Sequence, residues 1–197
     1  MERVSLILAS GSPRRKEILE EMSLLFEVRS ADVDETLRDG ESAESAARRL
    51  ALDKGEAVAK EAVDSLIIAA DTLVTVEGEI LGKPKDENDA RRMLKLLSGR
   101  GHEVVTGIAF ILRAEDVRHV VFSRTEVFFR KLSEIDIEDY ISTGEYAGKA
   151  GAYAIQSAGG TLIESHSGSF SNVVGLPVTE VLKFASAFGI DRFPWKG

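Results

Sequence analysis

Two arginines near the start of the chain, Arg14 and Arg15, directly follow Ser12 and Pro13. Serine is a favourable helix N-cap and proline fits the first helical position, so the pattern predicts a helix that begins at Pro13. The start of a helix attracts anions, and arginine offers a forked set of donors to phosphate oxygens. The spacing therefore predicts a phosphate site, although a solvated basic helix start fits the same residues.

Asp71 is the strongest candidate for a catalytic carboxylate. It follows the apolar run 65–70, which predicts a buried central strand that ends at Asp71 and Thr72. Open α/β sheets bind their ligands at the carboxyl ends of such strands. Asp71 can there act as a general base or hold a metal ion, and the capping of a turn is the structural alternative.

Other charged residues give weaker signals when each is taken alone. The acidic loop 32–35 can supply a second carboxylate for Mg²⁺, which prefers oxygen ligands shared with phosphates. Lys54 lies on a predicted helix among Ala and Leu, and Lys83 lies in a stiff turn between Gly82 and Pro84. Both lysines are candidate phosphate contacts, while a surface position is the commoner role for each.

The segment 148–156 combines glycines with Lys149, Tyr153 and Gln156. Gln156 can read the edge of a nucleobase through its paired donor and acceptor, and tight packing of small residues explains the segment equally well. The Gly82-Lys83-Pro84 sequence is not a P-loop, because proline replaces the required hydroxyl residue. The three histidines lie far apart, without the spacing of metal ligands.

Composition narrows the function further. The 197 residues carry a net charge of −8, which argues against a nucleic acid polymer as partner. The absence of cysteine excludes disulfides and thiolate catalysis. No apolar run is long enough for a membrane span and no signal peptide is visible, so we expect a cytoplasmic protein.

Helical patterns alternate with apolar strand-like runs along the whole chain. Helices are expected at 13–22, 43–62, 88–97, 133–141 and 177–188, and strands at 4–9, 25–29, 65–70, 73–76, 79–81, 103–112 and 117–129. The last two strands form a long hairpin, and the region 148–175, rich in Gly and Ser, is expected to form loops that join short strands. The order predicts an α/β fold with a mixed central sheet flanked by helices.

Taken together, these segments resemble the Maf family of nucleoside triphosphate pyrophosphatases. The matching pieces, in the family's order, are LILASGSPRRKEIL, the helix with ALDK, AADTLVTVEGEILGKPKD, LSGRGHEVVTG, GKAGAYAIQ and GSFSNVVGLPV. The resemblance is to the branch that acts on dTTP and UTP. It implies one Maf-type domain over residues 1–197, with an ITPase-like fold of two lobes and a cleft.

The activity implied by the resemblance is hydrolysis of a nucleoside triphosphate to the monophosphate and pyrophosphate, assisted by a divalent cation, Mg²⁺ or Mn²⁺. Asp71 falls on the family's catalytic carboxylate, which we expect to act as general base. The base-specificity positions are Arg14, Thr72 and Gln156. Matches to phosphate-binding positions are Ser10, Arg15, Lys54, Lys83 and Lys149, and the metal-binding positions are Glu35 and Asp71.

The family is also linked to the exclusion of non-standard nucleotides and to arrest of septum formation, so two other functions stay open. One is a regulator of cell division that binds triphosphates without hydrolysing them. The other is a pyrophosphatase for a different nucleotide, such as 7-methyl-GTP. We expect a nucleoside triphosphate as the partner, with no nucleic acid polymer and no membrane, and a homodimer is compatible with the sequence.

Overall fold

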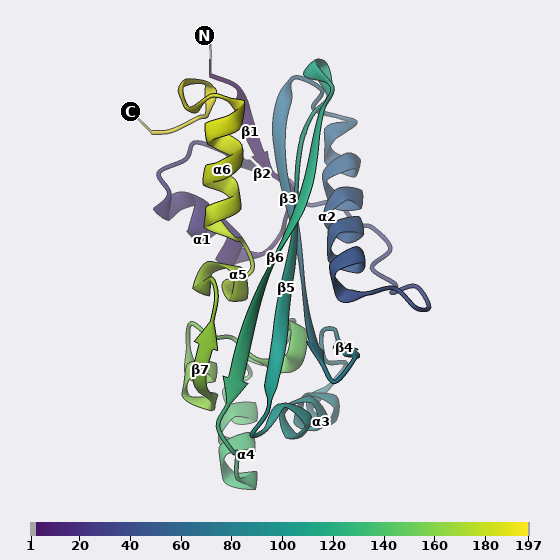
Figure 1. The fold of residues 1–197 in the computed structure, drawn as a ribbon, viewed down its shortest axis with the longest axis vertical. Coiled ribbons are helices and arrows are strands. Elements are labelled where there is room, and N and C mark those ends of the chain that lie inside the picture. The colour runs from purple at the N-terminus through teal and green to yellow at the C-terminus, as the bar shows by residue number, and fades with distance from the viewer. Residues whose placement is uncertain (1–2, 197) are drawn as a thin grey trace. The chain divides into compact units, whose positions relative to one another are not determined.

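The computed structural model describes residues 3–196, which form a seven-stranded sheet with helices packed against it (Figure 1). The strands are β1 Ser5–Leu8, β2 Glu27–Val28, β3 Ser65–Val76, β4 Glu79–Leu81, β5 Gly101–Leu112, β6 Val117–Phe129 and β7 Ile163–Ser167. The helices are α1 Pro13–Glu21, α2 Ala43–Ala59, α3 Glu87–Leu97, α4 Glu134–Ser142, α5 Phe170–Val174 and α6 Val178–Phe188. The sheet order is β2-β1-β3-β5-β6-β7, with β4 paired to β3. The prediction of a mixed α/β fold with a central sheet flanked by helices is confirmed.

The described residues divide into two compact units. Unit 1 holds the chain up to Asp71, the segment Thr106–Ser123 and the residues from Gly175 onward. Unit 2 holds Thr72–Val105 and Arg124–Val174. Strands β3, β5 and β6 therefore contribute residues to both units. Between residues 3 and 196, no helix is both long and apolar enough to cross a bilayer.

In unit 1, the strand pleat decides which side chains meet helix α2. Successive residues of a strand point to opposite faces, so alternate apolar residues of β1, β3 and β5 line one face. This face and α2 share one buried cluster: Ile7, Ala9, Ala51, Val58, Ala59, Ile67, Ala69, Ala109 and Ile111. Phe110 points to the other face, where its ring stacks on Phe184 of α6 with centroids 4.0 Å apart. Asp71 follows Ala69 by two residues and thus shares the α2 face.

The prediction that the central strand ends at Asp71 is wrong, since β3 continues to Val76. The residues after Asp71 are mostly β-branched, and they pair with β4 through the tight turn Glu77-Gly78, where both residues have positive φ. Sheet pairing on both sides of one aspartate outweighs its poor strand propensity. Asp71 is therefore held inside a strand, where the backbone fixes its position.

Helix α2 lies unusually close to the sheet at Gly107 of β5. A Cβ atom built on Gly107 would lie 2.2 Å from the carbonyl oxygen of Ala47 in α2. Real side chains do not approach a backbone oxygen so closely, so only glycine fits there. This contact sets the height of α2 above the strands.

Unit 2 is built on the β3–β4 hairpin and the outer parts of β5 and β6. Helix α3 is capped by Asp86, whose side chain accepts from the Asp89 amide, and α4 is capped by a capping box between Ser133 and Asp136. The region 148–175 was expected to be loops that join short strands. It holds a single strand, β7, together with short 3₁₀ turns and α5.

Candidate functional site

In unit 1, the carboxyl end of β1 lies beside the middle of the parallel strand β3. Leu8 pairs with Ile68, and the Ala9 amide donates to the Ile68 carbonyl at 2.8 Å. The turn after β1 therefore begins beside the part of β3 that carries Asp71. Ser10 opens this turn, and α1 starts three residues later at Pro13.

The hydroxyl of Ser10 organises the turn before α1. It accepts from the Ser12 amide at 3.2 Å and from Nη1 of Arg15 at 3.0 Å. Ser12 does occupy the N-cap position, as predicted, but its side chain makes no capping hydrogen bond. Ser10 thus ties the turn to the first turn of α1.

Arg15 is also held by a residue distant in the sequence, because its Nε donates to the Gly175 carbonyl at 2.8 Å. Burial lowers the pKa of Arg15, the charge of Asp71 raises it, Arg14 lowers it and Glu35 raises it. An arginine keeps its charge despite such burial. These effects indicate that Asp71, Arg14 and Glu35 all lie close to the Arg15 guanidinium group.

Lys54 of α2 joins the two predicted metal ligands. Its Nζ lies 2.5 Å from Oδ1 of Asp71 and 2.6 Å from Oε1 of Glu35. The side chains of Lys54 and Asp71 are 12% and 11% exposed, whereas Glu35, in the loop before α2, is 43% exposed. The structure thus brings Ser10, Arg14, Arg15, Glu35, Lys54 and Asp71 together in unit 1, and we call these six residues the unit 1 cluster.

The unit 1 cluster combines three cationic side chains with two carboxylates. Within residues 3–196, no group of three or more His, Cys, Asp or Glu side chains is arranged to hold a metal ion. Glu35 and Asp71 nevertheless present two oxygen donors to one point, which is the donor type that Mg²⁺ prefers. Because Mg²⁺ takes its remaining ligands from water and substrate phosphates, the pair fits a cation that binds together with a polyphosphate.

The other predicted residues, Thr72, Lys83, Lys149 and Gln156, lie in unit 2. A backbone hydrogen bond of 3.1 Å from the Gly151 amide to the Gly82 carbonyl joins the turn of Lys83 to the segment of Lys149. Gly151 has a φ of 67°, and a Cβ atom there would lie 3.0 Å from the side chain of Val74. The two lysine-bearing segments are therefore fixed next to each other and against β3.

Gln156 is exposed and follows a buried stretch that is anchored by two tyrosines. The hydroxyl of Tyr153 forms a 2.8 Å hydrogen bond with Nε2 of His102, and the hydroxyl of Tyr140 accepts from the Ala154 amide at 3.2 Å. Burial lowers the pKa of His102 to about 4, so the imidazole is neutral at ordinary pH. These anchors hold the segment that ends at Gln156.

Some contacts of the site were not predicted from the sequence. The Gly175 carbonyl that receives Arg15 and the His102 that anchors Tyr153 both fall in segments used for the family resemblance, GSFSNVVGLPV and LSGRGHEVVTG. Neither segment carries a local sequence pattern that points to catalysis or binding. Only the order of the two segments along the chain, which matches that of the family, could have pointed to Gly175 and His102.

Comparison with known proteins gives consistent results over nearly the whole chain. A family model described as "Maf-like protein" matches residues 5–188. A dTTP/UTP pyrophosphatase of Clostridioides difficile is 47% identical over 178 residues, which cover 90% of this chain and 92% of that protein. A dTTP/UTP pyrophosphatase of Myxococcus xanthus is 45% identical over 99% of this chain and 97% of that protein. Among solved structures, the Staphylococcus aureus Ham1 protein matches with a TM-score of 0.47 and 19% identity, over 64% of this chain and 71% of that chain.

Proposed function

The chain belongs to the Maf family, and we propose that it hydrolyses dTTP and UTP to the nucleoside monophosphate and pyrophosphate. The observation that carries the proposal is the unit 1 cluster, in which one buried carboxylate, Asp71, is surrounded by cationic groups of the kind that bind phosphates. The relatives named dTTP/UTP pyrophosphatase supply the substrate class. We place the reaction in the cytoplasm and assign residues 1–197 to a single Maf-type domain.

Substrate phosphates are proposed to bind at the start of α1. The helix N-terminus, Arg14 and Arg15 offer donors and positive charge to the same anion. Arg15 is already oriented by Ser10 and Gly175, so little side-chain freedom is lost on binding. Lys54 adds a third positive charge next to Asp71.

Glu35 and Asp71 are the residues that would hold a divalent cation, Mg²⁺ or Mn²⁺. When bound, such a cation withdraws negative charge from phosphate oxygens and favours deprotonation of water. The fit rests on the convergence of the two carboxylates on one point, now contacted by the Lys54 ammonium.

Asp71 is proposed to take a proton from the attacking water. The water oxygen forms a bond to the α-phosphorus, the bond from that phosphorus to the bridging oxygen of the β-phosphate breaks, and pyrophosphate leaves. Cationic side chains around Asp71 stabilise the charge that develops on the departing group. The position of Asp71 inside β3 keeps the acceptor fixed during this step.

Residues of unit 2 complete the proposal. Lys83 and Lys149 are assigned to the phosphates, and Thr72 and Gln156, with Arg14 of unit 1, to the choice of base. The hydrogen bond between the Gly82 and Gly151 backbones supports a shared role for the two lysines.

The proposal is tested by incubating the purified protein with dTTP, UTP and 7-methyl-GTP in the presence of Mg²⁺ and measuring monophosphate and pyrophosphate. We expect Asp71→Asn to lower kcat by about 10²–10⁴-fold, the usual contribution of a general base, with an unchanged circular dichroism spectrum. Asp64→Asn, which changes an exposed aspartate just before β3, is the matched control and should retain full activity. Intact triphosphate with the wild-type protein would support a binding regulator instead, and faster cleavage of 7-methyl-GTP would assign a different substrate.

A further inference from the structure

Arg49 of α2 joins its helix to the loop that carries Glu35. Its Nε and Nη2 donate to the two carboxylate oxygens of Glu41 at 2.8 and 2.7 Å, which is a bidentate pair. Nη2 also donates to the Thr36 carbonyl at 3.1 Å, and Nη1 lies 3.7 Å from Oδ2 of Asp53. One guanidinium thus connects both ends of the loop segment 36–41 to one turn of α2.

This contact is protected from water. The side chains of Arg49 and Glu41 are only 15% and 11% exposed. The hydrogen bond from Arg49 lowers the pKa of Glu41 to about 2. The pair therefore stays ionised at every pH at which the proposed reaction would be measured.

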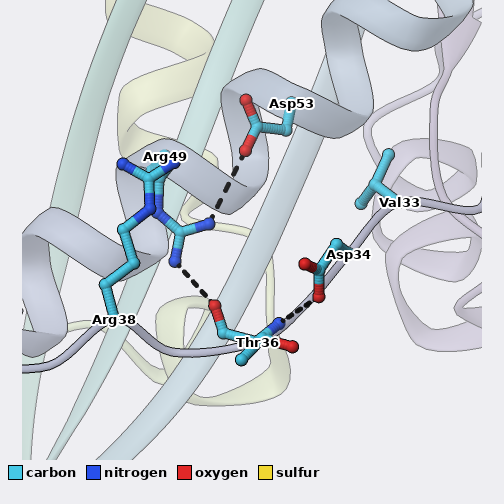
Figure 2. A pocket seen from close by; sticks show the side chains of 6 residues that line it. All are labelled: Val33, Asp34, Thr36, Arg38, Arg49 and Asp53. Carbon is cyan, nitrogen blue, oxygen red and sulfur yellow. Dashed lines mark hydrogen bonds and ion pairs between the residues drawn. The ribbon is translucent and has the colours of Figure 1, made fainter.

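Packing alone does not hold the loop. A hollow of about 360 Å³ adjoins it, lined by Val33, Asp34, Thr36, Arg38, Arg49 and Asp53. Figure 2 shows Arg49 reaching from α2 toward Thr36, while the Thr36 amide turns back to Asp34. Because side chains do not fill this space, the position of the loop depends on the polar contacts of Arg49.

The residues on either side of this contact belong to the unit 1 cluster. Glu35 directly precedes Thr36, and Lys54 directly follows Asp53. Glu35 is 43% exposed, so its contact with Lys54 needs a loop that is already in place.

We propose that Arg49 is a positioning residue of the pyrophosphatase reaction, which holds the loop so that the Glu35 carboxylate meets Lys54 and Asp71. The inference rests on the proposed function and adds to it a residue that does not touch the substrate. Arg49 acts through Glu35, and its removal should change both loop order and the use of the divalent cation.

The test uses Arg49→Gln and Arg49→Lys, with Arg91→Gln as the matched control. Arg91 makes the same bidentate contact with Glu138, at 2.7 and 2.9 Å, but joins α3 to α4. We expect both Arg49 variants to lower kcat/KM for dTTP by about 10–100-fold, as is typical for residues that orient a metal ligand, and to raise the Mg²⁺ concentration for half-maximal rate. Arg49→Lys should not restore activity, because an ammonium group cannot reproduce the planar, forked donor set with which Arg49 reaches Glu41 and Thr36. Arg91→Gln should match the wild type.

Amide hydrogen exchange provides a readout that does not depend on activity. Exchange should increase in residues 32–41 of Arg49→Gln and stay unchanged in β1 and β3, whereas a general loss of stability would raise exchange throughout unit 1. If Arg49→Gln does not fold, Glu41→Gln removes the same ion pair and leaves the arginine in α2. Unchanged exchange in residues 32–41 of the variant that folds would overturn the proposal.

A double-mutant cycle separates positioning from an independent effect. In a Glu35→Gln background, Arg49→Gln should lower kcat/KM by less than a further twofold, because the effect of Arg49 passes through Glu35. Full additivity would overturn the positioning role. If the wild-type protein leaves dTTP and UTP intact, the proposed function and this role both fail, whereas an active wild type with a fully active Arg49→Gln variant rejects the positioning role alone.

Discussion

Lys54 links the stability of unit 1 to its proposed chemistry. Its ammonium group lies between Asp71 and Glu35, and both Lys54 and Asp71 are almost completely shielded from water. Exposed ion pairs contribute little to stability, but a buried carboxylate that loses its counter-charge is costly. Lys54, which is proposed to assist the reaction, thus also permits the burial of Asp71, the proposed general base.

We expect Lys54→Met to lower the free energy of unfolding by about 1–3 kcal/mol, since it leaves a buried carboxylate without its nearest cation. Arg15 remains close to Asp71 and keeps the loss below that of an isolated buried charge. Urea unfolding followed by the fluorescence of Trp195, the only tryptophan, measures the change. Lys95→Met, which removes an exposed pair with Glu134, should change stability by less than about 0.5 kcal/mol. Equal effects of the two substitutions would contradict this interpretation.

The sequence identified the members of the unit 1 cluster but not their contacts. Asp71 and Lys54 stand out because each interrupts an apolar pattern, and Arg14 and Arg15 because cations are unfavourable at a helix start. The contact of Lys54 with Asp71 depends on α2 lying on one particular face of β3. The contact of Arg15 with Gly175 joins residues 160 positions apart, and no local pattern contains that information.

A buried hydrogen bond connects strand β5 to the segment that ends at Gln156 in unit 2. His102, near the start of β5, meets the hydroxyl of Tyr153, and its ring packs edge-on against Phe129 of β6. Burial lowers the pKa of His102 and raises that of Tyr153, so both groups stay neutral. The connection is therefore sensitive to acid.

The free energy of unfolding should decrease as the pH is lowered, because His102 binds a proton more readily in the unfolded chain than in the folded protein. Its pKa is about 4 in the folded protein, below the ordinary value of 6.5, so its contribution is complete above pH 6.5 and is lost as the pH falls toward 4. The loss amounts to about 3 kcal/mol. His102→Gln can still hydrogen-bond to Tyr153 but does not titrate, so urea unfolding between pH 4 and 7 should show a flatter profile for this variant. Parallel profiles for the two proteins would contradict the assignment.

The elements with strong periodicity were predicted well, and the errors have a physical origin. Helix α3 and the long hairpin of β5 and β6 follow their apolar patterns closely. The predicted end of β3 at Asp71 is too early, because local propensity favours a strand end at an aspartate, whereas pairing with β4 extends the strand to Val76. The region 148–175 has glycines and serines that suit several backbone conformations, so its 3₁₀ turns could not be predicted.

Considered as a whole, the chain matches its family across both compact units, and the predicted site residues are divided between them. Alternating helices and strands were enough to predict the fold class. The sheet order was not predictable, because it depends on which distant strands pair. Ligand binding offers a test at this level, since any nucleotide that binds only the folded chain stabilises it.

Asp71→Asn should bind dTTP without consuming it, which makes the variant suitable for thermal unfolding. With Mg²⁺ and dTTP at about 100 times the dissociation constant, the free energy of unfolding should rise by about 2.7 kcal/mol. For a chain of this size, that corresponds to an increase of about 5–10 °C in Tm. Thymidine, which lacks phosphates, is the control and should give little change. An identical Tm with dTTP and with buffer would show that the unit 1 cluster does not bind the triphosphate.

The absence of a side chain at Gly107 has a consequence for residues well away from it. Ala47, whose carbonyl oxygen occupies the space above Gly107, precedes Lys54 by seven residues, or about two turns of the same helix. A helix transmits a displacement along its axis with little bending, so any group larger than hydrogen at position 107 would lift the far end of α2 as well. The distance between the Lys54 ammonium group and the Asp71 carboxylate therefore depends on the absence of a Cβ atom at position 107.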